Sequence, residues 1–198
     1  MHYLTFELKG RAPLLMHNGR LADPLNPYTV ALKRATEVKK KTETQHQEVA
    51  RLEFLGGLYL NADGEPIIPC ENIEAMVKYA GRRKKLGQEC ERAVVCLGDP
   101  GLVLGGGNWP KGETALWEWK NHVLAFRKTA GMRGSTVVRT RPMFATWTLR
   151  VELQLDTTMM NPDTLKDVLK IAGREIGLGD WIPRYGRFEA ECVSERSA

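Results

Sequence analysis

Residues 176–191 read IGLGDWIPRYGRFEAE, and the interpretation of the rest of the chain depends on this stretch. Its first part is rich in the glycine, proline and aromatic residues of an irregular loop. Its end alternates apolar with polar residues, which is typical of a strand. We therefore expect a glycine-rich loop that leads directly into a last strand over residues 187–193.

The preceding segments continue this alternation of strands and helices. Asn161 and Pro162 form a helix start, and the apolar spacing that follows predicts a helix over residues 162–175. Before it, WTLRVELQL alternates strictly, which predicts a strand over residues 146–155.

The N-terminal half supplies the other core elements. We expect a strand over residues 3–9, a helix over residues 72–84 and a short strand over residues 93–97. The resulting order is β-α-β-β-α-β, which predicts an α+β protein with a ferredoxin-like, or RRM, core.

Two insertions interrupt this order. We expect one domain, residues 1–198, with a helical insertion at residues 11–66 and a loop insertion at residues 98–135. Within the first insertion, Thr44 and Gln47 have the spacing of a capping box and predict a helix start.

The composition bounds the classes of function. The chain carries 29 Lys and Arg against 24 Asp and Glu, a net charge of +5 that is compatible with a polyanion partner but does not require one. Its four cysteines lack zinc-ligand spacing, and no glycine cluster continues as a phosphate-binding loop, so we expect reduced thiols, no metal and no cofactor. The N-terminus is a strand pattern and no apolar run reaches about 20 residues, so we expect a cytoplasmic protein without membrane contact.

Two stretches carry a family resemblance. EPIIPCENIEAMVKYAG, residues 65–81, resembles the segment that opens the first helix in the RAMP superfamily, the CRISPR-associated RRM-fold proteins that hold guide RNA. In that segment Cys70, Glu71 and Asn72 stand where the family has Gly-Ser-Ser. Residues 176–191 resemble the family's glycine-rich loop, with matches at Gly177, Gly179, Gly186, Arg187 and Phe188.

This resemblance implies a non-catalytic protein, like a guide-RNA backbone subunit, that binds single-stranded nucleic acid. RNA is favoured over DNA, and DNA stays open because the sequence shows no group that reads the 2′-hydroxyl. The resemblance further implies that residues 98–135 form a thumb-like arm. Assembly of several copies along one nucleic-acid strand is left open. The whole chain also resembles proteins of tailed phages and prophages in PLLMHNGRLADPLNP, RLEFLGGLY and VRTRPMF, which implies a bacterial host cytoplasm.

The glycine-rich loop contains the residue types that bind nucleic acid. Glycine lets backbone N–H groups approach a phosphate, arginine adds charged contacts, and aromatic rings stack on bases. The alternative is a structural helix cap and turn. The candidate residues are Gly177, Gly179, Trp181, Arg184, Tyr185, Gly186 and Arg187.

Further basic residues form two kinds of candidate site. Arg133 precedes a strand in which we expect Arg139 and Arg141 on one face. These arginines either bind successive phosphates of a nucleic acid or are the solvated charges of an edge strand. Two basic runs are either solvated faces or surfaces that steer a polyanion, namely residues 39–41 and the four residues Arg82, Arg83, Lys84 and Lys85.

Two alternative functions stay open. Related RAMP ribonucleases use a loop histidine or aspartate, which makes His17 and Asp23 weak catalytic candidates here. Alternatively, the chain docks on a host CRISPR complex, or mimics part of one, through an aromatic surface that contains Trp109, Trp117 and Trp119.

Overall fold

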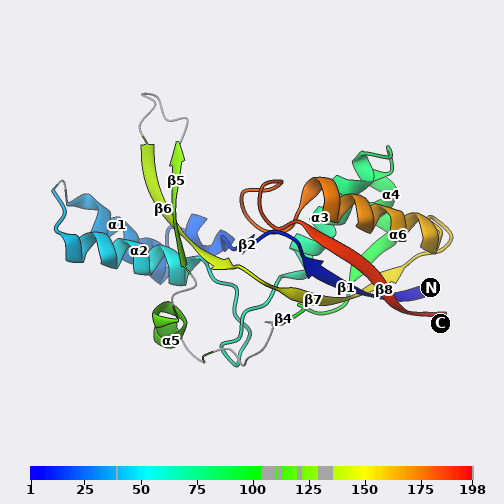
Figure 1. The fold of residues 1–198 in the computed structure, drawn as a ribbon, viewed down its shortest axis with the longest axis horizontal. Helices are drawn as coiled ribbons and strands as arrows, with labels where there is room; N and C mark the ends of the chain where they lie inside the picture. Colours follow the sequence, from blue (N-terminus) through cyan, green and yellow to red (C-terminus); the bar gives the residue numbers. More distant parts are fainter. Residues whose placement is uncertain (39, 104–109, 111–112, 120–121, 129–135, 198) are drawn as a thin grey trace. The chain divides into compact units, whose positions relative to one another are not determined.

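The computed structural model describes residues 1–38, 40–103, 110, 113–119, 122–128 and 136–197 (Figure 1). The chain divides into two compact units. Unit 1 contains Met1–Leu15, Leu60–Trp109 and Ala145–Ala198, and unit 2 contains Met16–Tyr59 and Pro110–Phe144. In the described part of the chain, no helix is long and apolar enough to span a membrane.

Unit 1 is built on an antiparallel sheet with the strand order β3-β7-β1-β8. Its strands are β1 (His2–Gly10), β3 (Val94–Cys96), β7 (Thr148–Leu155) and β8 (Phe188–Ser197), and the short β4 (Leu102–Val103) also pairs with β7. The helices of unit 1 are α3 (Cys70–Arg82), α4 (Gly87–Ala93) and α6 (Pro162–Ile171), and α6 continues into a π-helical turn, η2 (Ala172–Ile176). The short β2 (Leu14–Leu15) follows β1 in the chain.

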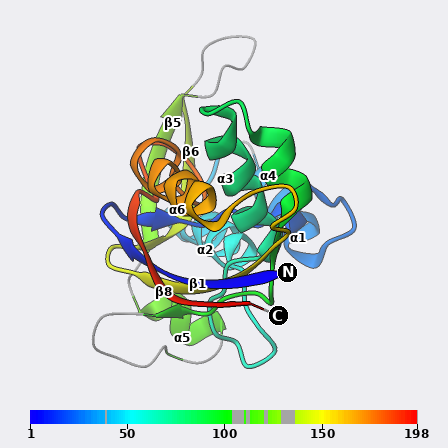
Figure 2. The ribbon, with the colours of Figure 1, turned by 90° about the vertical axis from the view of Figure 1, so that its right-hand side faces the viewer.

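The order β1-α3-β3-β7-α6-β8 confirms the predicted α+β ferredoxin-like core. The first and last strands of this core lie side by side, so β1 occupies an inner position between β7 and β8. Figure 2 shows α3 and α6 on the same face of the sheet.

The core of unit 1 follows from the alternation in the sequence. Leu4, Phe6 and Leu8 of β1 are buried, and so are the corresponding apolar residues of β7. The apolar stripes of α3 and α6 are buried as well, and the two helices contact each other. Each fully buried leucine or phenylalanine contributes about 1.5–3 kcal/mol, so this layer is the main source of stability in unit 1.

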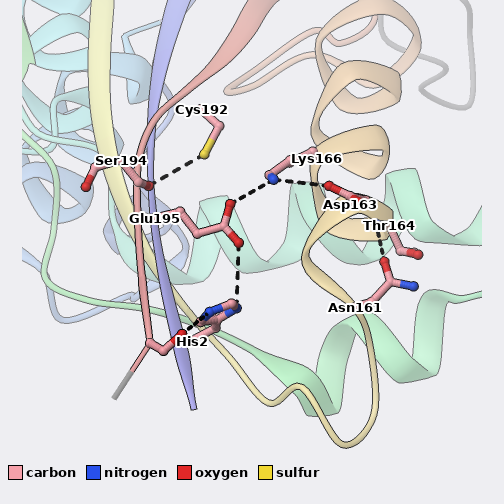
Figure 3. Close-up of polar contacts among 9 residues, drawn as sticks. His2, Asn161, Asp163, Thr164, Lys166, Cys192, Ser194 and Glu195 are labelled. Carbon is pink, nitrogen blue, oxygen red and sulfur yellow. Dashed lines mark hydrogen bonds and ion pairs between the residues drawn. The ribbon is translucent and has the colours of Figure 1, made fainter.

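A network of polar contacts connects the end of β8 with α6 (Figure 3). Glu195 accepts a hydrogen bond from Lys166 Nζ, at 2.8 Å, and Lys166 also contacts Asp163 at 3.1 Å. The hydrogen bond to Glu195 raises the pKa of Lys166. His2 of β1 lies 2.6 Å from the Ser197 hydroxyl. The C-terminal half of β8 is thereby held in register, and it extends beyond the predicted residues 187–193.

The helix α4 was not predicted. It has only seven residues, and five of its positions are polar or glycine, so its sequence carries no apolar stripe. It forms because Gly81 of α3 leaves room for Cys90: a Cβ atom at Gly81 would lie 2.4 Å from the Cys90 sulfur. This is a tertiary contact that periodicity does not reveal.

Unit 2 combines helices with a β-hairpin. Its helices are α1 (Pro27–Glu37), α2 (Glu43–Gly57), α5 (Glu113–Glu118) and the 3-10 turn η1 (Gly19–Ala22). The strands β5 (His122–Lys128) and β6 (Thr136–Phe144) pair from His122 with Pro142 to Lys128 with Thr136. The structure therefore places α5 and β5 within residues 98–135, where the sequence predicted irregular chain. The proposed insertion boundaries stay a prediction.

The start of α2 differs from the prediction by two residues. The N-cap is Thr42, whose side chain accepts a hydrogen bond from Gln45 N, while the Gln45 side chain accepts one from Thr42 N at 2.9 Å. The capping box is thus Thr42 to Gln45, and the prediction of Thr44 to Gln47 is wrong. Both pairs have the same spacing, and only the extended backbone at Thr42 distinguishes them.

Replacing Thr42 by alanine tests this assignment. We expect Thr42→Ala to lower the free energy of unfolding by about 1 kcal/mol, because one N-terminal N–H group of α2 loses its partner. The matched control Thr44→Ala changes an exposed position within the first turn and should stay within about 0.5 kcal/mol. Urea unfolding followed by circular dichroism measures both, and a larger effect at Thr44 would contradict the assignment.

Candidate nucleic-acid interface

The glycine-rich loop, residues 177–187, is tied to the chain segment that follows β1. Leu178 N donates to Gly186 O at 2.9 Å and closes the loop on itself. Gly186 N donates to Pro13 O, and Asp180 N donates to Leu15 O, each at 2.8 Å. The loop is therefore fixed in unit 1 by its own backbone before any ligand binds.

The glycines are needed for close approach of backbone segments. Gly177, Gly179 and Gly186 all have positive φ, at 85°, 86° and 70°. A Cβ atom at Gly186 would lie 1.8 Å from Leu178 O, and one at Gly179 would lie 2.3 Å from Leu15 O. The N–H groups of Gly177 and Gly186 donate to carbonyl groups within the protein. This corrects the interpretation that these two N–H groups face a phosphate.

The two arginines of the loop remain accessible to a ligand. Arg187 is exposed, and its Nε donates to Pro183 O at 2.7 Å. Its two terminal nitrogens have no partner among the described residues, and Arg184 is exposed and likewise unpaired there. The structure thus orients the Arg187 guanidinium and leaves its outer edge open.

The aromatic residues of the loop contact each other. The Trp181 and Tyr185 rings are half-buried, with centroids 6.1 Å apart and planes tilted by 53°. They contribute to the stability of the loop, and part of each ring surface stays exposed to solvent.

A groove of about 570 Å³ lies beside Arg187. Its charged lining consists of five basic and two acidic side chains: Lys9, Arg11, Lys170, Arg174, Arg187, Glu189 and Glu191. Arg11 donates to Glu189, and this hydrogen bond lowers the pKa of the Glu189 carboxyl. We call this site the Arg187 groove. Four of its five basic groups lie within ion-pair distance of carboxylates, and Arg187 is the one whose terminal nitrogens stay without a partner among the described residues.

The basic run at the end of α3, Arg82 to Lys85, is exposed. Both interpretations of this run, a solvated face and a surface that steers a polyanion, require that exposure. Arg83 Nε lies 3.8 Å from Glu175, and Lys84 donates to Asp167 at 3.0 Å, which lowers the pKa of that carboxyl. Arg82 lies over the Tyr79 ring, and Lys85 has no partner among the described residues. Exposed ion pairs of this kind contribute only about 0–1 kcal/mol, so a phosphate can displace them.

The arginines of β6 do not form the open phosphate track that was one of the predictions. Arg141 is buried, with 6% of its surface exposed. Arg139 donates to the buried carboxylate of Glu53 at 2.7 Å, and Thr140 N donates to the other oxygen of the same carboxylate. Arg139 thereby links β6 to α2 in unit 2, while the buried Arg141 donates to Thr140 O at 3.1 Å. Arg133 lies outside the described residues.

The weak catalytic candidates His17 and Asp23 both take part in local structural contacts. His17 is exposed, and its carbonyl accepts a hydrogen bond from the Tyr59 hydroxyl at 3.2 Å. The Asp23 carboxylate accepts one from Leu25 N at 2.9 Å, as in an ordinary turn. Within the described ranges, no group of three His, Cys, Asp or Glu residues could hold a metal ion.

The remaining predicted positions are mostly structural. Trp117 packs edge-on against Phe54 of α2 in unit 2, at 5.4 Å between ring centroids, while Trp109 lies outside the described residues. Lys41 donates to Val38 O at 2.7 Å near the end of α1, and Lys39 is also outside the described residues. At the start of α3, Cys70 N donates to the Asp99 carboxylate at 2.8 Å. A protein carboxylate thus occupies this helix terminus.

Sequence reasoning missed four basic residues of the Arg187 groove. Lys9, Arg11, Lys170 and Arg174 come from β1, the segment after it, α6 and η2. They lie far apart in the sequence, and each looks like an ordinary surface charge there. The pairing of β1 with β8 brings Lys9 and Arg11 next to Arg187, and the packing of α6 and η2 against β8 adds Lys170 and Arg174.

Comparisons with known proteins support the fold. No family model matches the sequence, and no curated protein matches it either. The chain is similar to one chain of a structure described as the cryo-EM structure of the Type III-B Cmr-beta bound to cognate target RNA, with a TM-score of 0.56 and 16% identity. The match covers 98% of this chain but only 60% of that chain. It supports the α+β ferredoxin-like fold, while membership of the RAMP superfamily and the phage origin stay predictions.

The role of Gly186 can be tested by substitution. We expect Gly186→Ala to lower the free energy of unfolding by about 2 kcal/mol or more, because a Cβ atom there collides with Leu178 O at positive φ. Gly101→Ala is the control in the same unit, since nothing lies within 4 Å of its Cβ position. Equal melting temperatures for the two variants would show that the loop does not adopt this conformation.

Proposed function

We propose that this protein binds single-stranded RNA non-catalytically, with the phosphate backbone at the Arg187 groove and the neighbouring end of α3. The observation that carries the proposal is the Arg187 guanidinium, which the Pro183 carbonyl orients at a basic groove while its outer edge stays open. Such a planar donor set fits a phosphate with two parallel hydrogen bonds.

The surroundings of Arg187 suit a chain of phosphates better than a single anion. Lys170 and Arg174 also line the groove, and their exposed ion pairs with Asp167 and Glu175 are weak enough for a phosphate to displace. Arg184 adds an unpaired charge within the same loop, in the part of the chain that the structure describes. Neutralising several phosphates releases counterions, and this release drives binding at low salt.

RNA is proposed over DNA because the similar chain belongs to a complex bound to target RNA. The proposal includes the predicted role in a CRISPR-type assembly, where several copies or other subunits share one RNA strand. It assigns no step of RNA cleavage to His17 or Asp23.

Substitution of Arg187 tests the proposal. Arg187→Ala should weaken binding of a 12-nucleotide single-stranded RNA roughly tenfold at low salt, the effect of losing one charge-assisted contact. The slope of log K against log salt concentration should fall by about 0.7, because one phosphate is no longer neutralised. Fluorescence anisotropy across a salt series measures both quantities.

The matched control is Arg34→Ala, which removes an exposed arginine of α1 with no partner among the described residues. It should leave affinity and slope close to those of the wild type. Equal losses in the two variants would indicate only a nonspecific charge effect, and the assigned site would be wrong. The same titration with DNA of the same sequence tests the preference for RNA.

A further inference from the structure

A second groove, of about 470 Å³, is lined in part by Ile182 and Pro183 of the glycine-rich loop. Tyr79 and Arg82 of α3 form one wall, and Ile176, Ile182 and Pro183 form the other. Arg83 and Glu175 complete the lining. We call this site the Tyr79 groove, and it lies entirely within unit 1.

The Tyr79 groove exposes large apolar side chains to water. Tyr79 is 46% exposed and Ile182 is 40% exposed, although most large apolar residues of unit 1 are buried. Leaving such surface in water costs about 25 cal/mol for each Å² of apolar area. A ligand with a flat apolar face recovers this free energy when it enters the groove.

The charge around the groove selects the class of ligand. Arg82 and Arg83 line it, and Lys84 and Lys85 follow them directly on the exposed end of α3. An apolar platform with cationic neighbours is the combination by which proteins bind single-stranded nucleic acid: bases stack, and the backbone follows the charges. The Arg82 guanidinium lies 5.0 Å from the centroid of the Tyr79 ring and helps to hold that ring in place.

The two grooves are linked through Pro183. Its side chain lines the Tyr79 groove, and its carbonyl accepts the hydrogen bond from Arg187 Nε that orients this residue at the Arg187 groove. Glu175 provides a second link, since it contacts Arg83 on one side and Arg174 on the other. A strand held at Arg187 therefore passes next to the Tyr79 groove.

We infer that the Tyr79 groove binds one base of the single strand, stacked on Tyr79, while Arg187 holds a nearby phosphate. The inference rests on the proposed function and adds a base-binding site that is tolerant of sequence, because stacking uses the π-face that every base has. Four groups carry it: the Tyr79 ring, the apolar Ile182 and Pro183, and the basic end of α3.

The test compares a 12-nucleotide oligoadenylate with a 12-nucleotide abasic ribose-phosphate strand of equal charge. Wild-type protein should bind the abasic strand roughly 5- to 100-fold more weakly, the expected effect of losing one stacked base. Tyr79→Ala should lose a similar factor on oligoadenylate and little more on the abasic strand. Its salt slope should stay unchanged, unlike that of Arg187→Ala, because stacking neutralises no phosphate.

The controls are Tyr79→Phe, which keeps the stacking ring and should bind normally, and Tyr3→Ala. Tyr3 is a matched tyrosine, because the Arg196 guanidinium lies 4.8 Å from its ring centroid. Circular dichroism confirms that each variant is folded. If the wild type binds neither strand, the proposed function fails and the inference with it. If it binds oligoadenylate but Tyr79→Ala binds equally well, the inference alone is overturned. A loss confined to Tyr3→Ala would also overturn it and would place stacking at Tyr3.

Discussion

The close approach of Gly186 to Leu178 is the constraint on which the candidate site depends. One hydrogen bond, from Leu178 N to Gly186 O, closes the loop, and the gap between the two backbones leaves no room for a Cβ atom. A second contact of the same kind joins Gly179 to Leu15. These contacts fix the position of Pro183, which in turn orients Arg187. The glycines determine the shape of the loop, and Arg187 provides the donors for the proposed contact with a phosphate.

The basic residues of the chain divide into two groups with different physical roles. Some neutralise carboxylates within the protein, of which Arg139 with the buried Glu53 is the clearest case in unit 2. A buried carboxylate that loses its partner is costly, so this arginine is not available to a ligand. Others, such as Arg187 and Arg184, are exposed and keep donors without a partner in the described part of the chain. Only the second group can bind a polyanion without loss of stability.

The sequence predicted the elements of unit 1 well because their apolar periodicity is strong, as the strand β7 and the helix α6 show. It singled out the glycine-rich loop as a candidate because glycine, arginine and aromatic residues cluster there locally, and the binding role of these residues stays a prediction. It did not predict α4, whose existence depends on a contact between Gly81 and Cys90. Nor did it predict the groove residues Lys9 and Lys170, which the pairing of β1 with β8 and the packing of α6 on β8 bring together. It also misjudged Arg141, because alternation along a strand does not reveal which face another element covers.

The most direct test of the central claim is photochemical cross-linking of the protein to a single-stranded RNA that contains 4-thiouridine, with the cross-linked peptides identified by mass spectrometry. We expect cross-links on peptides that contain the glycine-rich loop, η2 and the end of α3, which line the two grooves. Cross-links confined to α1 and α2 of unit 2 would contradict it, because these helices take no part in either groove.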